Sequence, residues 1–515
     1  MFRPLVVLAL ACLALPVSAQ TLYGELEMQW GDPKPVPAGH YRAKPVFQVN
    51  LVDRFGRKQA LDPEQAKAAA GDLFMMSGKP VAIEFSQSPT SRSKGPTIEA
   101  IVPVRLSQKA HPVSQQAMAQ GAAIGGNTRW VTIACKFSDV ATEHKPISFF
   151  TSQYGNATGQ LGHYWSEVSY GKINLAGSQA YGWFNLPSAR ATYVPAGQRA
   201  NLGRLFEDCA AAADPTVNFN GVAGINMMFN GELDGFAWGG SSCATIEGVR
   251  QCPRVTWNPP WSFNNLAPLA HEMGHGYGLP HSDNSDGDTD TYDNPWDNMS
   301  DAWNRGVSDS TYGTRPKHIN IFQRDRLGWV DAQRKVVIPE NPTTTQEFVL
   351  DAASLSGSGN TQMIVLQMPA SPDPYSTRLY TLEARVRGGS FEGNLAGDAV
   401  IIHRIDSTIA YSIDADNPPA NNSSNEGSMF KVGENWNNGR HWVAITGRTA
   451  NGFIVTVGPQ PQLRVTGGNL PPRLMNGGAT PNQQAPSGAI APNPVIRNKP
   501  VPKKPNQTRR FTLER

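Results

Sequence analysis

The most informative stretch of this chain is His271-Glu272-Met273-Gly274-His275-Gly276-Tyr277-Gly278-Leu279-Pro280-His281, which has the pattern HExxHxxGxxH. His271 and His275 are four residues apart, so on a helix their imidazoles lie on one face, one turn apart. Gly278 can end this helix because glycine adopts the left-handed conformation at little steric cost. The chain can then turn back and bring His281 next to the other two imidazoles.

Three neutral imidazoles at about 2.0–2.1 Å from a zinc ion leave its fourth tetrahedral position open to water, which is typical of a catalytic site. Glu272 follows the first ligand directly, and its position suits a general base that acts on the zinc-bound water. We therefore predict His271, His275 and His281 as zinc ligands and Glu272 as the catalytic residue. The alternative is a set of ordinary helix histidines. It is disfavoured because five fixed positions coincide by chance with a probability on the order of 10⁻⁵.

The pattern, together with a methionine-containing turn after it, resembles the metzincin family of zinc proteases. The candidate turn is Trp296-Asp297-Asn298-Met299-Ser300, and Met299 lies eighteen residues after His281. The resemblance implies that Met299 forms a hydrophobic floor beneath the histidines; the alternative is an ordinary packing methionine. The sequence from Asp293 to Ser300 is similar to that of the gametolysin and immune-inhibitor-A branches of secreted zinc proteases. Astacins and serralysins have a zinc-ligating tyrosine two residues after the methionine, but that position here is Asp301, so no tyrosine ligand is carried over.

The first nineteen of the 515 residues have the features of a signal peptide. Arg3 precedes an apolar run from Leu5 to Leu15, and Val17-Ser18-Ala19 provides a small-residue cleavage site. The run is too short for a transmembrane helix. A lipoprotein interpretation of Cys12 is disfavoured because the apolar run continues past it. We expect a soluble, secreted protein, extracellular or periplasmic, without a transmembrane segment.

The cysteines favour disulfides, which persist in exported proteins. Without Cys12 the chain has Cys135, Cys209, Cys243 and Cys252, which allow three pairings. We favour Cys243–Cys252, which closes a short loop, and by elimination Cys135–Cys209. The alternative is that Cys135, inside an apolar run, is a buried free thiol. No CxxC spacing is present, so a cysteine metal site is not expected.

A chain of this length is too long for one core, and we expect an α+β protein of several domains. The predicted catalytic domain is of the metzincin type, a mixed sheet plus the active-site helix, between a β-rich N-terminal domain and a C-terminal β-sandwich. The predicted segments are a signal peptide (1–19), the N-terminal domain with a linker (20–126), the catalytic domain (127–332), the sandwich (333–458) and a disordered basic Pro/Asn-rich tail (459–515).

The N-terminal domain contains β-like runs and one helical stretch, Pro63 to Met75. The resemblance implies a latency propeptide in this place. Residues 20–126 contain no cysteine, so a cysteine block of the zinc is excluded, whereas an acidic residue or a steric plug remains open. A permanent accessory domain is an equal alternative. Ser107 to Asn127 is predicted to be a linker and a site of proteolytic processing.

Two further stretches bear on the catalytic domain. Gly235–Ser242 and Arg254–Trp257 are candidates for the edge strand that, by the resemblance, pairs with an extended substrate. The active-site helix is expected to begin near Asn264 or Asn265, which are good N-cap residues, with Pro268 in its first turn.

The segment Ser282 to Asp293 contains five Asp in the eleven residues from Asp283 to Asp293. Such a loop could bind Ca²⁺, which prefers hard oxygen ligands. The spacing does not fit an EF-hand, and a solvated acidic loop is the favoured alternative. The cofactor expected is Zn²⁺, with Ca²⁺ left open.

The net charge of +3 is unevenly distributed. The tail has nine Lys and Arg against Glu514, so the rest of the mature chain is net negative. The positive charge therefore does not indicate a nucleic-acid-binding face. The tail could contact an anionic cell surface, or it could be a removable segment.

These features favour a secreted zinc endopeptidase that acts on protein or peptide substrates through a zinc-bound water activated by Glu272. Two alternatives remain: a non-catalytic cell-surface binding protein on a zinc-protease scaffold, and a hydrolase of peptidoglycan cross-links that uses the same site.

Overall fold

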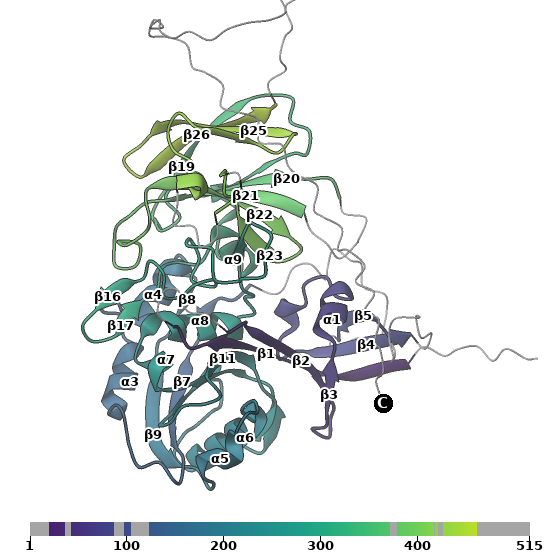
Figure 1. Ribbon diagram of the computed structural model, residues 1–515, viewed down its shortest axis with the longest axis vertical. Coiled ribbons are helices and arrows are strands. Elements are labelled where there is room, and N and C mark those ends of the chain that lie inside the picture. Colours follow the sequence, from purple (N-terminus) through teal and green to yellow (C-terminus); the bar gives the residue numbers. More distant parts are fainter. Residues whose placement is uncertain are drawn as a thin grey trace, which may run out of the picture.

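The computed structural model describes residues 20–36, 43–86, 97–104, 123–370, 378–416, 418–420 and 426–460. The predicted signal peptide, most of the predicted linker and nearly all of the basic tail lie outside these residues. The described chain is a mixed α+β fold with many strands and few helices (Figure 1), so the predicted class is confirmed. Within these residues, no helix is long and apolar enough to cross a membrane.

The central sheet is built on parallel strands β9 (Gln179–Asn185), β7 (Trp130–Lys136), β10 (Gly224–Phe229) and β14 (Arg254–Asn258), which are neighbours in that order. Strand β11 (Phe236–Ser241) follows β14 and runs antiparallel to it. Every residue of β10 and all but the last residue of β7 are buried. Their apolar runs reflect a sheet that is covered on both faces.

Helices cover both faces of the central sheet. Helix α6 (Leu202–Ala213) packs its apolar side into one hydrophobic cluster with strands β7 and β10. Helices α4 (Leu161–Val168) and α8 (Leu266–Gly276) contribute to the cluster on the opposite face. The remaining short helices and strands of this part are α3 (Ile147–Gln153), α5 (Arg190–Tyr193), α7 (Pro260–Phe263), α9 (Ile321–Arg326), β6 (Gly126–Asn127), β8 (Ile173–Asn174), β16 (Val307–Asp309) and β17 (Gly313–Arg315).

Two disulfides are present, with the predicted pairings. Cys135 on β7 is bonded to Cys209 on α6, which ties the sheet to its helical cover, so Cys135 is not a free thiol. Cys243 is bonded to Cys252 at the base of the hairpin formed by β12 (Ala244–Ile246) and β13 (Val249–Gln251). Disulfides are compatible with an extracellular protein.

The N-terminal residues extend this same sheet. Strand β1 (Gln20–Pro33) pairs with β2 (Val46–Val52), with β4 (Pro80–Ser86) and with β11, giving a ten-stranded sheet that crosses the boundary predicted at residue 126. The other elements are β3 (Lys58–Leu61), α1 (Pro63–Ala68), the 3₁₀ turn η1 (Phe74–Met76) and β5 (Thr97–Pro103). The predicted helix Pro63–Met75 is therefore two pieces, and Gly71, a poor helix former, lies between them.

The C-terminal residues form two sheets that share one hydrophobic cluster. The strand orders are β15-β23-β22-β21-β20-β18 and β19-β26-β25-β24. Their bounds are β15 (Asp283–Asn284), β18 (Lys335–Ile338), β19 (Gln346–Asp351), β20 (Met363–Gln367), β21 (Arg378–Arg385), β22 (Ala399–Asp406), β23 (Ile409–Ser412), β24 (Asn435–Asn437), β25 (His441–Arg448) and β26 (Gly452–Pro459); the 3₁₀ turns are η2 (Ala332–Arg334) and η3 (Glu426–Ser428).

A buried ion pair joins these sheets to the preceding part of the chain. The Arg385 guanidinium contacts Glu392 through two hydrogen bonds of 2.7 Å and donates a third to the carbonyl of Trp296. Glu392 accepts a hydrogen bond of 2.8 Å from the backbone N–H of His318. Burial opposes the ionisation of Glu392, but Arg385 and His318 lower its pKa to about 2. The pair therefore stays ionised and fixes the C-terminal sheets against the segment that carries Met299.

Candidate functional site

Helix α8 positions the first two histidines of the motif. It begins after Asn265, as predicted, although the Asn265 side chain accepts a hydrogen bond from the Thr314 N–H at 3.0 Å instead of capping the helix. After the helix, Gly278 has φ +86°, the left-handed conformation expected there. Its neighbour Leu279 donates a backbone hydrogen bond of 3.1 Å to Gly274, which closes the helix and turns the chain back toward His281.

The three predicted histidines gather at one point. Their ring centroids are 4.7 Å apart for His271 and His275, 4.8 Å for His275 and His281, and 5.3 Å for His271 and His281. Nδ1 of His271 lies 2.6 Å from the carbonyl of Asn298, and Nδ1 of His275 lies 2.7 Å from the carbonyl of Leu279. Because a carbonyl can only accept, each Nδ1 carries a proton, which leaves Nε2 as the ring nitrogen that could bind a metal.

Met299 packs directly under this helix. It is fully buried, and a Cβ added to Gly274 would lie 2.4 Å from its sulfur, so only glycine permits this contact. The residue before it, Asn298, supplies the carbonyl that orients His271. The predicted turn therefore serves the site in two ways: one residue supports the helix and its neighbour fixes an imidazole.

A fourth group completes the cluster, and the sequence analysis did not identify it. Asp32, on β1, places Oδ1 at 2.7 Å from Nε2 of His281 and 3.4 Å from Nε2 of His271, and Oδ2 at 3.2 Å from Nε2 of His275. The potential ligand atoms of these four side chains all lie within 4.8 Å of one another. Asp32 thus adds a carboxylate to the three imidazoles that the motif predicted.

The four side chains could hold a metal ion, and their spacing can be compared with that of a zinc site. Ligands about 2.0–2.1 Å from a tetrahedral metal lie about 3.3 Å apart. The Asp32 distances to His271 and His275 are close to this value. Nε2 of His271 is buried and, apart from the 3.4 Å contact with Asp32, has no hydrogen-bond partner among the described residues. An imidazole nitrogen buried in this way is costly unless it binds a metal. Three imidazoles and one carboxylate are typical zinc ligands, so His271, His275, His281 and Asp32 could hold the ion.

Glu272 lies beside the cluster and is 1% exposed. Its Oε2 has no hydrogen-bond partner in the described part of the chain. Burial raises the pKa of Glu272 well above its usual value, and the charge of Asp32 raises it further. Gly239 of β11 lies against the backbone of Glu272. A Cβ added to Gly239 would be 2.4 Å from the Glu272 carbonyl oxygen. The lack of a side chain at this point lets helix α8 approach the strand.

A small pocket opens next to His271 and Glu272. Its walls include Trp261, Trp303 and Tyr292. Tyr292 donates a hydrogen bond of 2.6 Å to Oδ1 of Asp32, and its ring lies 5.3 Å from that of His281. Nothing in the sequence singled out Tyr292, which lies in the acidic segment between the third histidine and Met299.

The charge of Asp32 is held by its neighbours. Burial opposes its ionisation, but His281 and His271 lower the pKa of Asp32 well below its usual value. The carboxylate therefore faces the histidines in its ionised form, as a metal ligand must.

Strand β1 lies along β11, beside the cluster. The two strands are antiparallel, with pairs from Gln29↔Gly240 to Pro33↔Phe236. Trp30, on the same side of β1 as Asp32, stacks on His275 with ring centroids 4.9 Å apart. Of the two predicted edge strands, β11 ends the sheet formed by residues 127–332, whereas β14 lies between β10 and β11 and is not an edge. The backbone edge expected to receive a substrate is thus occupied by the chain's own N-terminal strand.

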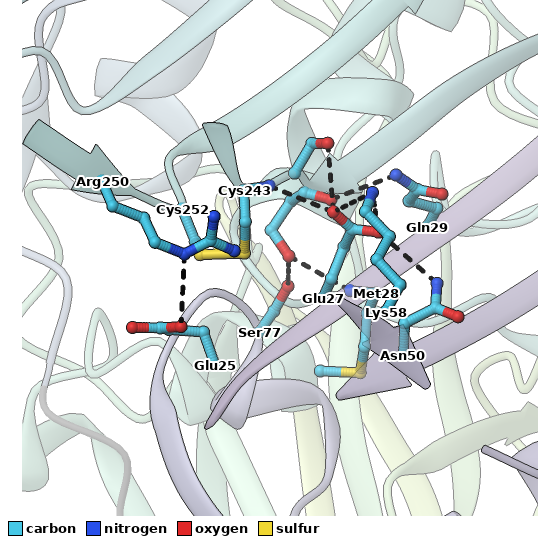
Figure 2. Close-up of a disulfide and its surroundings, with 12 residues drawn as sticks. Glu25, Glu27, Met28, Gln29, Asn50, Lys58, Ser77, Cys243, Arg250 and Cys252 are labelled. Atoms are coloured by element: carbon cyan, nitrogen blue, oxygen red, sulfur yellow. Dashed lines mark hydrogen bonds and ion pairs between the residues drawn. A yellow bond between two sulfur atoms is a disulfide. The ribbon is translucent and has the colours of Figure 1, made fainter. Parts of the chain in front are cut away.

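Glu27 anchors the same strand at the Cys243–Cys252 disulfide (Figure 2). Its buried carboxylate accepts hydrogen bonds from the Cys243 N–H at 3.0 Å and the Ser242 hydroxyl at 3.1 Å. Lys58 lies 2.8 Å from both of its oxygens. Cys243 and the residue before it therefore present two donors to β1, and Lys58 balances the charge of Glu27 inside the N-terminal segment.

The acidic segment after His281 forms a second group. Asp286, Asp288 and Asp293 bring one potential ligand oxygen each within 4.8 Å of one another. Burial raises the pKa of Asp293 to about 8, and burial with neighbouring carboxylates raises the pKa of Asp283 to about 7. The predicted alternative of a purely solvated loop does not describe Asp293, which is 2% exposed.

No protein-family model matches the chain, and no curated protein shows significant sequence similarity to it. The function must therefore be argued from the site itself.

Proposed function

We propose that this protein is a secreted zinc-dependent endopeptidase of the metzincin type, and that the structure describes its latent form. The observation that carries the proposal is the convergence of three imidazoles on one point, with the carboxylate of Glu272 beside it. Two of the imidazoles are oriented by backbone carbonyls, as metal ligands usually are. A structural zinc site has no use for the buried, unpaired Oε2 of Glu272.

The chemistry follows from the positions of these groups. When bound, a zinc ion supplies Lewis acidity to the scissile carbonyl and makes water more acidic. Glu272 accepts the proton of the attacking water and then delivers it to the leaving amine. The buried setting of Glu272 excludes bulk water from this proton transfer.

Strand β11 supports a peptide substrate. A free sheet edge binds any extended backbone through main-chain hydrogen bonds, and side-chain pockets add preference. In the structure this edge binds β1 over five residue pairs, and Asp32 lies among them. A substrate held in the same way would pass its backbone next to the metal ligands, so the substrate class is an extended or unfolded polypeptide.

The occupancy of this edge is the basis for the latency. Because β1 fills the edge and the Asp32 carboxylate would be a further ligand of a zinc ion held by the histidines, neither a peptide nor an attacking water could enter while the strand remains. We therefore assign the N-terminal segment the role of an inhibitory prosegment, in preference to a permanent accessory domain. Its carboxylate, Asp32, replaces the thiol that a cysteine block would need.

The experiment that tests the peptidase is a comparison of the wild type with Glu272→Gln, both after removal of the N-terminal segment by limited proteolysis. We expect equal zinc content and equal melting temperature, with hydrolysis of unfolded casein only by the wild type and only without a chelator. Equal hydrolysis by both proteins would refute the assignment of Glu272. Turnover of purified cell wall with none of casein would instead favour a peptidoglycan hydrolase, and no turnover of either would favour a binding protein.

A further inference from the structure

The segment between the third histidine and Met299 contains a second cluster of oxygen ligands. Asp286 and Asp288 lie two residues apart, and each accepts a backbone hydrogen bond from the residue two positions later. Asp293 closes the loop from its other end. The three carboxylates each place an oxygen within 4.8 Å of the other two, which brings like charges together.

Asp293 shows that this cluster is more than a solvated loop. It is 2% exposed, and its Oδ1 accepts a hydrogen bond of 2.8 Å from the Asn284 N–H. Its Oδ2 is buried and has no hydrogen-bond partner among the described residues. A buried, unpaired carboxylate oxygen is costly, and a cation is the partner that would remove this cost.

We propose that Asp286, Asp288 and Asp293 bind a calcium ion. The ligand atoms are all carboxylate oxygens, which hard cations prefer, and no nitrogen or sulfur ligand takes part. Ca²⁺ accepts six to eight oxygens in flexible geometry, so backbone carbonyls and water can complete its shell in an irregular loop. Mg²⁺ requires a near-ideal octahedron, which a loop built from successive turns is less suited to provide.

The position of the loop gives the ion a structural role. The loop begins directly after His281, and its first residues form β15, which pairs with β23 through Asp283↔Tyr411 and Asn284↔Ser412. Ser285 accepts a hydrogen bond of 3.0 Å from the Asp414 N–H. A calcium ion here would fix the path from the third histidine to the C-terminal sheets. This inference does not depend on the peptidase activity.

The chain offers a matched pair of variants. Asp288 and Asp290 are both exposed, and each accepts a backbone hydrogen bond from the residue two positions on, a bond that asparagine can keep. Only Asp288 belongs to the cluster. Asp288→Asn therefore removes a ligand charge, whereas Asp290→Asn removes the same charge from the same loop outside the cluster.

The test uses the full chain loaded with zinc and measures binding of terbium(III) by luminescence, its displacement by Ca²⁺, and the melting temperature with added Ca²⁺ or Mg²⁺. For the wild type we expect saturable terbium binding, displacement by Ca²⁺ at lower concentration than by Mg²⁺, and a higher melting temperature with Ca²⁺. We expect Asp288→Asn to weaken binding at least ~10-fold, because calcium affinity depends on ligand charge, and Asp290→Asn to resemble the wild type.

Two results would overturn the proposal. One is the absence of saturable terbium binding that Ca²⁺ displaces below ~1 mM, the weak end of protein calcium sites. The other is an equal loss of binding in Asp288→Asn and Asp290→Asn, which would mean that only the general charge of the loop attracts the ion. Zinc content, measured in parallel, shows whether either variant has disturbed the neighbouring histidines.

Discussion

Replacing Asp32 with alanine should release activity from the uncut chain. In the structure the Asp32 carboxylate accepts a hydrogen bond of 2.6 Å from Tyr292 and lies 2.7 Å from Nε2 of His281. Alanine removes these two contacts and the longer ones with His275 and His271, while the backbone pairing of β1 with β11 stays. The N-terminal strand is then held at the site by its ladder, by Trp30 and by the anchor at Glu27, and its segment is held by the pair of Asp72 with Arg326.

The size of the effect follows from the contacts that are lost. A hydrogen bond to a charged group contributes about 1.5–3 kcal/mol, so the two shortest contacts, with Tyr292 and His281, contribute about 3–6 kcal/mol to the closed state. Since every 1.4 kcal/mol is a factor of ten, the fraction of molecules with an open site should rise about 10²–10⁴-fold. While the open form remains a minor species, the rate of hydrolysis follows its population.

The assay is hydrolysis of a quenched fluorescent casein by the purified full chain. Mass spectrometry before and after the assay establishes that residues 20–104 remain attached. Asp53→Ala is the matched control, because this aspartate lies in the same segment but bonds only to its own turn and to Arg57 in the contacts described. The double variant Asp32→Ala with Glu272→Gln shows whether the released activity comes from the proposed site.

Three outcomes separate the possible errors. If the Asp32→Ala chain is as inactive as the wild type, but becomes active once its N-terminal segment is removed, the strand rather than its carboxylate is the block. If the uncut wild type is already as active as the variant, the latency is refuted. If the double variant keeps the released activity, the peptidase site is wrong.

Further variants test the neighbourhood of the site. Tyr292→Phe removes one donor to the blocking carboxylate, so the uncut chain should gain about 10–100-fold in activity, less than the aspartate variant; an unchanged rate would show that the hydroxyl does not hold the block. Gly239→Ala places a Cβ against the backbone of Glu272 and should lower the free energy of unfolding in urea by about 1–3 kcal/mol. Gly357→Ala is the control and should leave this free energy unchanged, because no atom lies within 4 Å of the added Cβ. The pKa of Glu392 is about 2 in the folded protein, below its value of about 4.3 in the unfolded chain. Its ionised carboxylate therefore stabilises the fold fully above about pH 4.3, and about 3 kcal/mol of unfolding free energy should be lost as the pH falls from about 4.5 to 2. Glu392→Gln should lack this part of the pH dependence.

The sequence predicted the parts of the site that are local in the chain. The three histidines and Glu272 lie within eleven residues, where helix geometry and one left-handed glycine determine their arrangement. The disulfide Cys243–Cys252 was predictable for the same reason, because its loop is short. The α+β class followed from the alternation of strand-like and helical runs.

Asp32 could not be predicted, because its role depends on contacts far apart in the chain. It reaches His281 only through the pairing of β1 with β11, across 249 positions. In the sequence it is one aspartate after a strand-like run, and no motif marks it. The edge strand was ambiguous for a similar reason: β11 and β14 have similar lengths and apolar character, and only the order of strands in the sheet separates them.

The way β1 is built into the N-terminal segment determines how activation can proceed. On the side away from β11, strand β1 pairs with β2, and the first half of β1 also pairs with β4. The strand that blocks the site is therefore hydrogen-bonded to two other strands of the N-terminal segment. That segment also holds Arg326 of α9 through a bidentate contact with Asp72, with distances of 2.7 and 3.1 Å. These contacts are independent of the covalent connection between residues 104 and 123.

A single cut in that connection should therefore not produce full activity at once. The N-terminal fragment would leave as a unit, and it must give up the β1–β11 ladder, the Asp72–Arg326 pair and the ligand Asp32 together. We expect the cut protein to elute as a complex at micromolar concentration and to gain activity on dilution, as the fragment dissociates. Asp72→Asn should shift this dissociation to higher concentration. Full activity immediately after the cut, independent of concentration, would mean that covalent attachment alone keeps the strand in place.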